Sequence, residues 1–369
     1  MNILLLTSVF SFVVIILPFW FMPYLTPKSI QFGVRIPREF ENDPAISSVR
    51  KSFHNLILVA VIILFFLLIL LPSLLGLYEL TLFAMPAAIV FTYLPYYRSF
   101  RRLHLIKMER GWYDNRIIAS SAFYSADSGT RKSLPGFIFL IPAIVIIIFT
   151  VFIGITIYTT LPGVIPTHFG TNGLPDQYSA KSIGSVFTGI FVQIGITLLM
   201  SILGYAIVRT GQTIDVSRPN MTFEQQERFK WYTRDALYLF AASINMTNMF
   251  SSFATWQIIG SQYMLPLILV PVFAGTSVLL IVVMSFGQMG SRLRVPGVAD
   301  EDTGLTNRND DRDWKGGVVN YNKQSSAILV PKRFGIGWTL NLANPKSWII
   351  LVLIIGLPLV LIVVGVLIH

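Results

Sequence analysis

The segment LPGVIPTHFGTNGLPDQYSAKS occupies residues 161–182 and separates two long apolar runs, at 137–160 and 183–208. The dipeptides Asn-Gly and Pro-Asp inside this segment are strong turn formers, so we expect an ordered polar loop. Each flanking run is long enough to form a helix that crosses the hydrocarbon core of a bilayer, which is about 30 Å thick. The pattern predicts two transmembrane helices joined by a compact loop.

The composition indicates a membrane protein. Hydrophobic residues make up 54% of the chain and charged residues only 12%. A soluble core cannot cover so much apolar surface, so a lipid bilayer must cover it. The net charge of +10 lies in loops between apolar runs, where it orients the protein, and we expect no nucleic-acid partner. The absence of cysteine excludes disulfides, thiol nucleophiles and thiolate metal sites.

Apolar runs of spanning length recur along the chain. They predict an all-α polytopic membrane protein with about eight transmembrane helices, at 1–25, 56–77, 80–97, 137–160, 183–208, 236–259, 264–286 and 348–368. The first run has no positive n-region and no small-residue cleavage site, so we interpret it as a retained span.

The distribution of basic residues predicts the orientation. All but one of the 28 lysine and arginine residues lie in four loops, at 26–55, 98–135, 209–234 and 287–347, and the exception is Lys181. With an even number of spans, these four loops fall on one side, which the positive-inside rule assigns to the cytoplasm. We therefore expect a plasma-membrane protein with both termini and the 161–182 loop outside.

These boundaries divide the chain into five regions. They are an N-terminal three-helix membrane region (1–135), a helix-loop-helix around the outer segment (136–210), a cytoplasmic capping segment with a two-helix hairpin (211–286), a cytoplasmic loop module (287–347) and the final span (348–369). In the third region, Thr222 and Gln225 have the spacing of a capping box. In the fourth, residues 318–321 and 327–330 predict a small β-hairpin. The acidic runs at 300–302 and 310–313 lack the EF-hand ligand pattern and predict a solvated linker.

The polar groups of the outer loop include His168, Asp176 and Tyr178. Two ligands, His168 and Asp176, are too few for a metal site, and no nucleophile is close in sequence, so we expect no metal and no cofactor. One interpretation is structural, with Asp176 capping a turn and Tyr178 anchoring the loop at the interface. The other is a ligand-binding surface.

The outer loop resembles a known signature. The pattern Leu-Pro-x-x-Ile-Pro-Thr-His-Phe-Gly-x-x-Gly-x-Pro-Asp-x-Tyr-x-x-Lys at 161–181 is similar to that of the SdpI-like family of bacterial membrane proteins. The resemblance covers mainly 137–208 and implies a helix, an outer loop and a returning helix. The marked positions are Pro166, His168, Gly173, Asp176 and Tyr178. The type member confers immunity to a secreted peptide toxin. In that family the loop follows the first helix, whereas here three further predicted helices precede the helix that leads into the loop.

A second resemblance lies in the last cytoplasmic loop. The motifs Trp-Lys-Gly-Gly at 314–317, Tyr-Asn at 321–322 and Val-Pro-Lys-Arg-Phe-Gly-Ile-Gly-Trp-Thr-Leu-Asn at 330–341 are similar to a small uncharacterised module often found at the C-terminus of such proteins. Lys332 and Arg333, next to Trp338, suit anionic lipid headgroups or a cytoplasmic regulator. Arg98, Arg101 and nearby bases predict either a lipid-facing basic stretch or a plain stop-transfer cluster.

The sixth predicted span is unusually polar. Asn245, Asn248 and Ser252 are among its polar residues. Such side chains form hydrogen bonds between helices or line a substrate path.

Three hypotheses follow for the function. The first is a non-catalytic SdpI-like protein for immunity to, or sensing of, an extracellular peptide or envelope stress. The alternative is a small-molecule permease that uses the polar sixth helix. The third, an intramembrane enzyme, requires His168 and Asp176 to converge with a third polar group. We expect no enzyme, because the chain has no P-loop, HExxH or GxSxG motif.

Overall fold

The computed structural model describes residues 3–114, 117–119, 136–170, 174–298 and 302–352. The described helices are α1 (Ile3–Leu25), α2 (Pro44–Phe65), α3 (Leu71–Leu74), α4 (Ala84–Glu109), α5 (Ile141–Ile157), α6 (Ile183–Val208), α7 (Pro219–Thr255) and α8 (Ser261–Phe286). A π-helical turn joins α2 to α3 without a break. The predicted all-α polytopic membrane fold is confirmed.

Six of the predicted spans are helices long and apolar enough to cross a bilayer. They are Leu4–Leu25, Pro44–Leu74, Tyr78–Glu109, Gly136–Thr160, Ile183–Val208 and Pro266–Gly290. The sixth predicted span belongs to α7, which begins 17 residues earlier than predicted and carries a polar first half, so it is not among these six. The last span begins as helix at 345–352, and its remainder lies outside the described residues.

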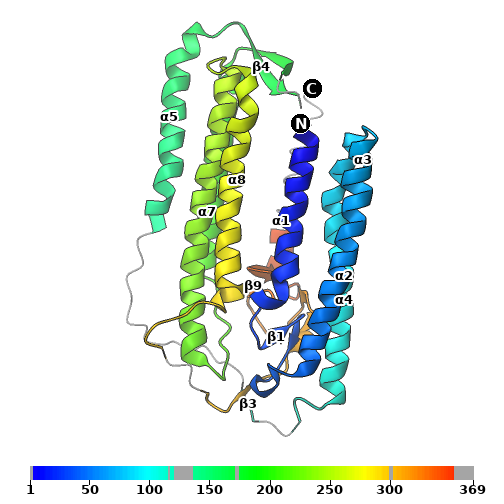
Figure 1. Cartoon of the computed structure of the whole chain (residues 1–369). Helices are drawn as coiled ribbons and strands as arrows, with labels where there is room; N and C mark the ends of the chain where they lie inside the picture. Colours follow the sequence, from blue (N-terminus) through cyan, green and yellow to red (C-terminus); the bar gives the residue numbers. More distant parts are fainter. Residues whose placement is uncertain (1–2, 115–116, 120–135, 171–173, 299–301, 353–369) are drawn as a thin grey trace.

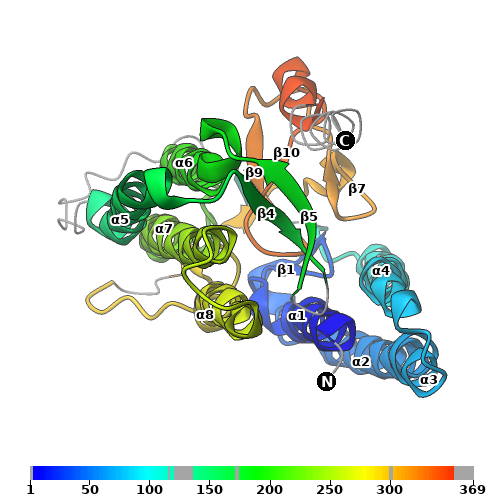
Figure 2. The ribbon, with the colours of Figure 1, turned by 90° about the horizontal axis from the view of Figure 1, so that it is seen from above.

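The helices form two groups that lie side by side (Figure 1, Figure 2). One contains α1, α2 and α4, and the other contains α5 to α8 with α7 at its centre, between α6 and α8. The groups meet where α1 contacts α8, with the rings of Phe10 and Phe273 stacked at 3.9 Å between centroids. The described parts of the four basic loops lie at one end of the molecule, which we call the basic end. The opposite end carries the segment at 161–182 and is called the hairpin end.

Helix α7 packs closely on α6 because glycine removes side-chain bulk at the contacts. A Cβ added at Gly189 would lie 2.3 Å from Oγ of Ser252, and one added at Gly204 would lie 2.6 Å from the ring of Tyr238. Small residues at such crossings bring helix backbones together in lipid, where dispersion contacts replace the hydrophobic effect as the driving force.

Short strands pair at both ends. The pairs are β1 (Ile30–Gln31) with β2 (Val34–Arg35), β3 (Ile118–Ala119) with β6 (Thr306–Asn307), β4 (Val164–Phe169) with β5 (Pro175–Ala180), β7 (Trp314–Lys315) with β8 (Val319–Asn320), and β9 (Leu329–Pro331) with β10 (Trp338–Leu340). The pair β3–β6 is parallel and the others are antiparallel.

The last loop does contain hairpins, but the predicted pairing of 318–321 with 327–330 is wrong. Strand β8 pairs with the strand that precedes it, β7, and β9 pairs with the strand that follows it, β10. Gly316 and Gly317 both have positive φ and reverse the chain before β8, and Gly335 and Gly337 do the same before β10. Glycine adopts this conformation without a Cβ penalty, so the glycines set the turns.

The predicted capping box at the start of α7 is also wrong. The helix begins at Pro219 with Arg218 at the N-cap position. Proline suits the first helical position because it has no amide hydrogen to satisfy. Thr222 therefore lies inside the first turn, where its hydroxyl donates to the carbonyl of Arg218 at 2.6 Å.

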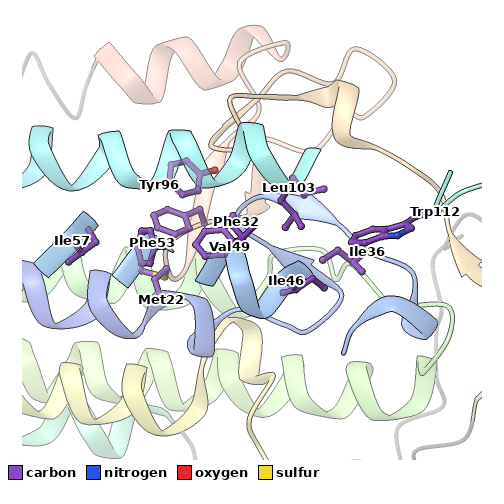
Figure 3. Packing of buried hydrophobic residues seen from close by; sticks show 12 residues of the cluster. Met22, Phe32, Ile36, Ile46, Val49, Phe53, Ile57, Tyr96, Leu103 and Trp112 are labelled. Atoms are coloured by element: carbon purple, nitrogen blue, oxygen red, sulfur yellow. The ribbon is translucent and has the colours of Figure 1, made fainter. Parts of the chain in front are cut away.

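The largest buried apolar cluster lies toward the basic end of the first helix group (Figure 3). Phe53 of α2 meets Phe32 of the β1–β2 turn edge-on at 5.2 Å. Tyr96 of α4 lies 3.8 Å from the ring of Phe334, which comes from the last loop. Two loops far apart in sequence are thus packed against the same helices.

Candidate functional site

The 161–182 segment is a β-hairpin that lies across helix ends at the hairpin end (Figure 2). The strands pair in register from Val164 opposite Ala180 to Pro166 opposite Tyr178. Beyond this point one extra residue interrupts each strand, first in β4 and then in β5. Such bulges twist a strand and redirect side chains. The turn dipeptides predicted a compact loop, but they did not predict these strands.

The two bulges bring His168 and Asp176 together. Nδ1 of His168 lies 2.5 Å from Oδ1 of Asp176, and both side chains are exposed, at 59% and 49%. No group of three or more potential metal-ligating side chains occurs among the described residues. The pair can therefore offer a hydrogen-bonding surface to a ligand.

Apolar and polar contacts fix the base of the hairpin. Ile165 is fully buried in a cluster with Leu161 and Trp256, and the indole nitrogen of Trp256 donates to a backbone carbonyl of α6. The ammonium of Lys181 donates to the carbonyls of Tyr158 and Leu161, at 3.2 and 2.9 Å. A cation at the end of α5 stabilises its unpaired carbonyl groups. The hairpin is thereby anchored to α5, α6 and α7.

The other marked positions differ in their surroundings. Pro166 is buried beside Ile165, whereas Tyr178 on the facing strand is 60% exposed. Gly173 lies outside the described residues. The exposed part of the predicted site therefore consists of His168, Asp176 and Tyr178.

A polar cluster joins three helices inside the second group. Asn245 of α7 is fully buried, and its amide nitrogen donates to Oγ1 of Thr197 on α6 at 2.8 Å and to a carbonyl of α5 at 3.3 Å. Gln193 of α6, also fully buried, donates to the carbonyl of Asn245 at 2.8 Å and to Thr150 of α5 at 3.3 Å. Gln193 is a residue that sequence reasoning missed, although a lone amide within an apolar run was a visible signal.

Asn248 and Ser252 make mainly local contacts. The amide of Asn248 donates to the carbonyl of Ile244, and the hydroxyl of Ser252 donates to the carbonyl of Asn248. Both bonds stay within one helix and add no link between helices. Of the three predicted polar residues, Asn245 is the one that connects helices.

A buried charge cluster lies at the basic end, where the sequence predicted a solvated linker. It consists of Arg35, Lys107, Asp310, Asp311 and Arg333. Asp311 binds Lys107 Nζ and Arg333 Nη1, each at 2.5 Å, and its Oδ1 accepts the amide of Arg35. Asp310 binds the guanidinium groups of Arg35 and Arg333. The linker prediction is therefore wrong at 310–311, because these carboxylates neutralise buried cations.

The basic side chains of this cluster determine the pKa values of its two aspartates. Burial alone would raise the pKa of Asp310, but Arg35 and Arg333 more than offset this, so the pKa lies well below its usual range. The pKa of Asp311 is also lowered, by Arg333 and Lys107 against the effect of burial. Both aspartates are thus held ionised.

The predicted lipid surface of Lys332, Arg333 and Trp338 is not formed as expected. The side chain of Arg333 is 2% exposed, and its Nη1 and Nη2 donate to Asp310, Asp311 and a backbone carbonyl, so it faces the protein interior. Trp338 packs beside Phe229 of α7, at 5.9 Å between ring centroids. Lys332 is partly buried, and desolvation lowers its pKa. Only an association with a partner or lipid at Lys332 and Trp338 remains a prediction.

Two family models match parts of the chain. Residues 145–194 match a domain of unknown function (DUF1648), which is found in membrane proteins that include SdpI-like families. Residues 323–348 match a family of unknown function (DUF5808). No curated protein and no solved structure matches the chain. The first match runs from α5 through the hairpin into α6, and the second contains β9 and β10. The chain is thus an integral membrane protein in which residues 145–194 are similar to DUF1648.

Proposed function

We propose that this protein is a non-catalytic, SdpI-like plasma-membrane protein of bacteria that binds an extracytoplasmic peptide through the β4–β5 hairpin, in immunity or sensing. The observation that carries the proposal is the anchored hairpin, which presents the His168–Asp176 pair and Tyr178 to solvent. The DUF1648 match, which contains the whole hairpin, supports it. The concentration of basic residues at the opposite end supports an outward-facing hairpin by the positive-inside rule.

The backbone of the hairpin supports a specific binding mode. The amide of Lys181 donates to the carbonyl of Gly163 at 2.8 Å. Hydrogen-bonded pairs alternate along antiparallel strands, so Tyr178 and Ala180 direct their amide and carbonyl groups away from β4. Among the described residues, neither strand pairs with a further strand. The residues of β4 that face them are Val164 and Pro166, and Pro166 has no amide hydrogen to offer. The outward carbonyl of Ala180 already accepts from Oγ of Ser185 at 2.9 Å. An extended peptide would therefore add to the edge of β5 through the outward groups of Tyr178 and the amide of Ala180.

The surroundings of His168 favour binding over catalysis. Acyl transfer or hydrolysis needs a nucleophile or a metal besides an acid–base pair. The side-chain contact of His168 is with Asp176, and both are open to solvent, where charges and protons are poorly controlled. We therefore propose no catalytic step.

The permease hypothesis has weaker support. It requires a water-filled substrate pathway lined by Asn245, Asn248 and Ser252. Asn245 and Ser252 are buried, and all three use their donors in hydrogen bonds to protein atoms. Tight packing of Ser252 against Gly189 further favours a structural role.

The first experiment measures protection of bacteria that express the full chain against the secreted peptide fraction of related bacteria. We expect protection by the wild type and its loss in His168→Ala/Asp176→Ala at equal membrane abundance. Thr167→Ala/Ser179→Ala is the matched control, because these exposed hydroxyls form another pair on the same hairpin, at 3.2 Å. Equal protection by the first variant would contradict hairpin binding, and no protection by the wild type would contradict immunity.

A second experiment tests the edge. Ala180→Pro removes one outward amide hydrogen while the inward hydrogen bonds of β5 remain, so we expect protection to fall with the hairpin intact. Unchanged protection would contradict strand addition at β5.

A further inference from the structure

A pocket at the basic end borders the buried charge cluster and is separate from the hairpin. Its volume is about 650 Å³, and it opens between α4 and the segment 309–316. Pockets of this size hold small ligands or lipid headgroups. Its walls differ in character, with aromatic side chains on one part and basic side chains on another.

The basic wall carries uncompensated positive charge. Arg101, Arg312 and Lys315 line the pocket and are exposed. Arg101 and Lys315 form no ion pair with another described residue. Asp311 also lines the pocket, but Lys107 and Arg333 already neutralise it at 2.5 Å. The pocket therefore favours an anion.

The aromatic wall is formed by Tyr97, Phe100 and Trp314. Tyr97 and Phe100 stack at 6.2 Å between ring centroids, and Trp314 is buried. An apolar surface next to uncompensated cations suits an amphiphile better than a free inorganic anion. Basic side chains bind the charged group of such a ligand, and aromatic rings contact its apolar part.

The residues of α4 near the pocket indicate that the pocket lies at the membrane interface. Tyrosine is enriched at membrane interfaces, and Tyr93 and Tyr97 lie on α4 where the apolar run ends. Arg101 is one helical turn further, about 6 Å along the axis, and so reaches the level of lipid phosphates. Tyr97 and Arg101 share a helix face because they are four residues apart.

We infer that this pocket binds the headgroup of an anionic phospholipid from the leaflet at the basic end. Arg101 and Lys315 contact the phosphate, and Tyr97 and Phe100 contact the glycerol and the first part of an acyl chain. This site is separate from the hairpin and does not depend on peptide binding there.

The test uses native mass spectrometry of the full chain in detergent, titrated with phosphatidylglycerol. The variant is Arg101→Gln/Lys315→Gln. The matched control is Arg98→Gln/Arg102→Gln, which removes the same charge from exposed positions of α4 outside the pocket. Each basic side chain near an anionic lipid surface contributes roughly a fivefold factor, so we expect about 25-fold weaker binding for the variant and a change within about threefold for the control.

Two further measurements distinguish an anionic lipid from a neutral lipid and from free inorganic phosphate. Phosphatidylcholine should bind at least about tenfold more weakly than phosphatidylglycerol, because its headgroup carries no net charge. Inorganic phosphate at high excess should leave the lipid bound, because it has no apolar part to contact the aromatic wall. Equal losses in variant and control, equal binding of both lipids, or displacement by inorganic phosphate would each overturn the proposal. Unchanged thermal unfolding of the variant confirms that any loss arises in the pocket.

Discussion

A hydrogen-bonded His–Asp pair and a buried ion pair lie at opposite ends of the molecule and have the same separation but different surroundings. His168 Nδ1 lies 2.5 Å from Asp176 Oδ1 on the hairpin, and Arg333 Nη1 lies 2.5 Å from Asp311 Oδ1 at the basic end. The first pair is about half exposed on each side, whereas the side chains of the second are 2% and 6% exposed. Exposed pairs contribute about 0–1 kcal/mol, because water and salt screen them. Removing one partner of a buried pair leaves a charge without compensation.

The two pairs also differ in the parts of the chain that they connect. The buried charge cluster joins the β1–β2 segment, α4 and the last loop, which are distant in sequence. The hairpin pair joins only two adjacent strands. We therefore expect substitutions in the buried charge cluster to alter stability and substitutions of the exposed His168–Asp176 pair to alter binding.

The largest effect is expected for Asp311→Ala. It leaves Lys107 buried without a carboxylate and Arg333 with Asp310 alone, and the free energy of unfolding should fall by about 3–5 kcal/mol. Asp302→Ala is the control, since Asp302 is 53% exposed and pairs with Arg38 at 3.3 Å. For it we expect a loss of about 0–1 kcal/mol. Denaturant unfolding in detergent measures both, and similar losses would contradict the distinction by burial.

Acid should weaken the buried cluster. The folded-state pKa values of Asp310 and Asp311 are lowered, so their contribution is fully present above the unfolded value of about 3.9 and is lost as pH falls toward the folded values. Between pH 5 and 2 the wild type should lose about 1–3 kcal/mol more than Asp311→Asn. Burial raises the pKa of Glu41, so the contribution of this carboxyl group to stability changes in the opposite sense, but equally in both proteins. Parallel pH profiles from unfolding at each pH would contradict this assignment.

A buried polar contact without charge gives an intermediate case. Asn245→Ala removes hydrogen bonds from α7 to α5 and α6, and we expect a loss of about 1–2 kcal/mol. Asn248→Ala is the matched control, because its amide bonds within its own helix, and we expect roughly 0.5 kcal/mol. Equal losses in thermal unfolding would mean that bonds between helices add nothing here.

The sequence predicts the spans well because the bilayer imposes a minimum apolar length. Helix α7 shows the limit of this rule, since its first half is polar and its full length could not be found from hydropathy. The π-helical turn between α2 and α3 likewise leaves no mark in the apolar pattern.

The buried charge cluster was not predictable from local sequence. Arg35 and Asp310 are separated by 275 residues, and no period or motif relates them. An acidic run in a basic loop is usually solvated, and only tertiary packing reveals that these carboxylates face Arg35 and Arg333. On the hairpin, the role of His168 and Asp176 in binding stays a prediction, and the contact between them depends on two bulges that turn dipeptides do not encode.

The smallest effect on stability is expected for His168→Ala/Asp176→Ala. Both side chains are exposed, so their removal should change the free energy of unfolding by at most about 1 kcal/mol. The anchoring contacts of Ile165 and Lys181 are untouched by these substitutions and should keep the hairpin in place. Ile165→Ala is the contrasting variant, because it deletes a fully buried side chain and should cost about 2–5 kcal/mol. Thermal unfolding of both in detergent checks this order. A large loss in the double variant would mean that the pair holds the two bulges in place, and its effect on peptide protection would then reflect folding and not binding.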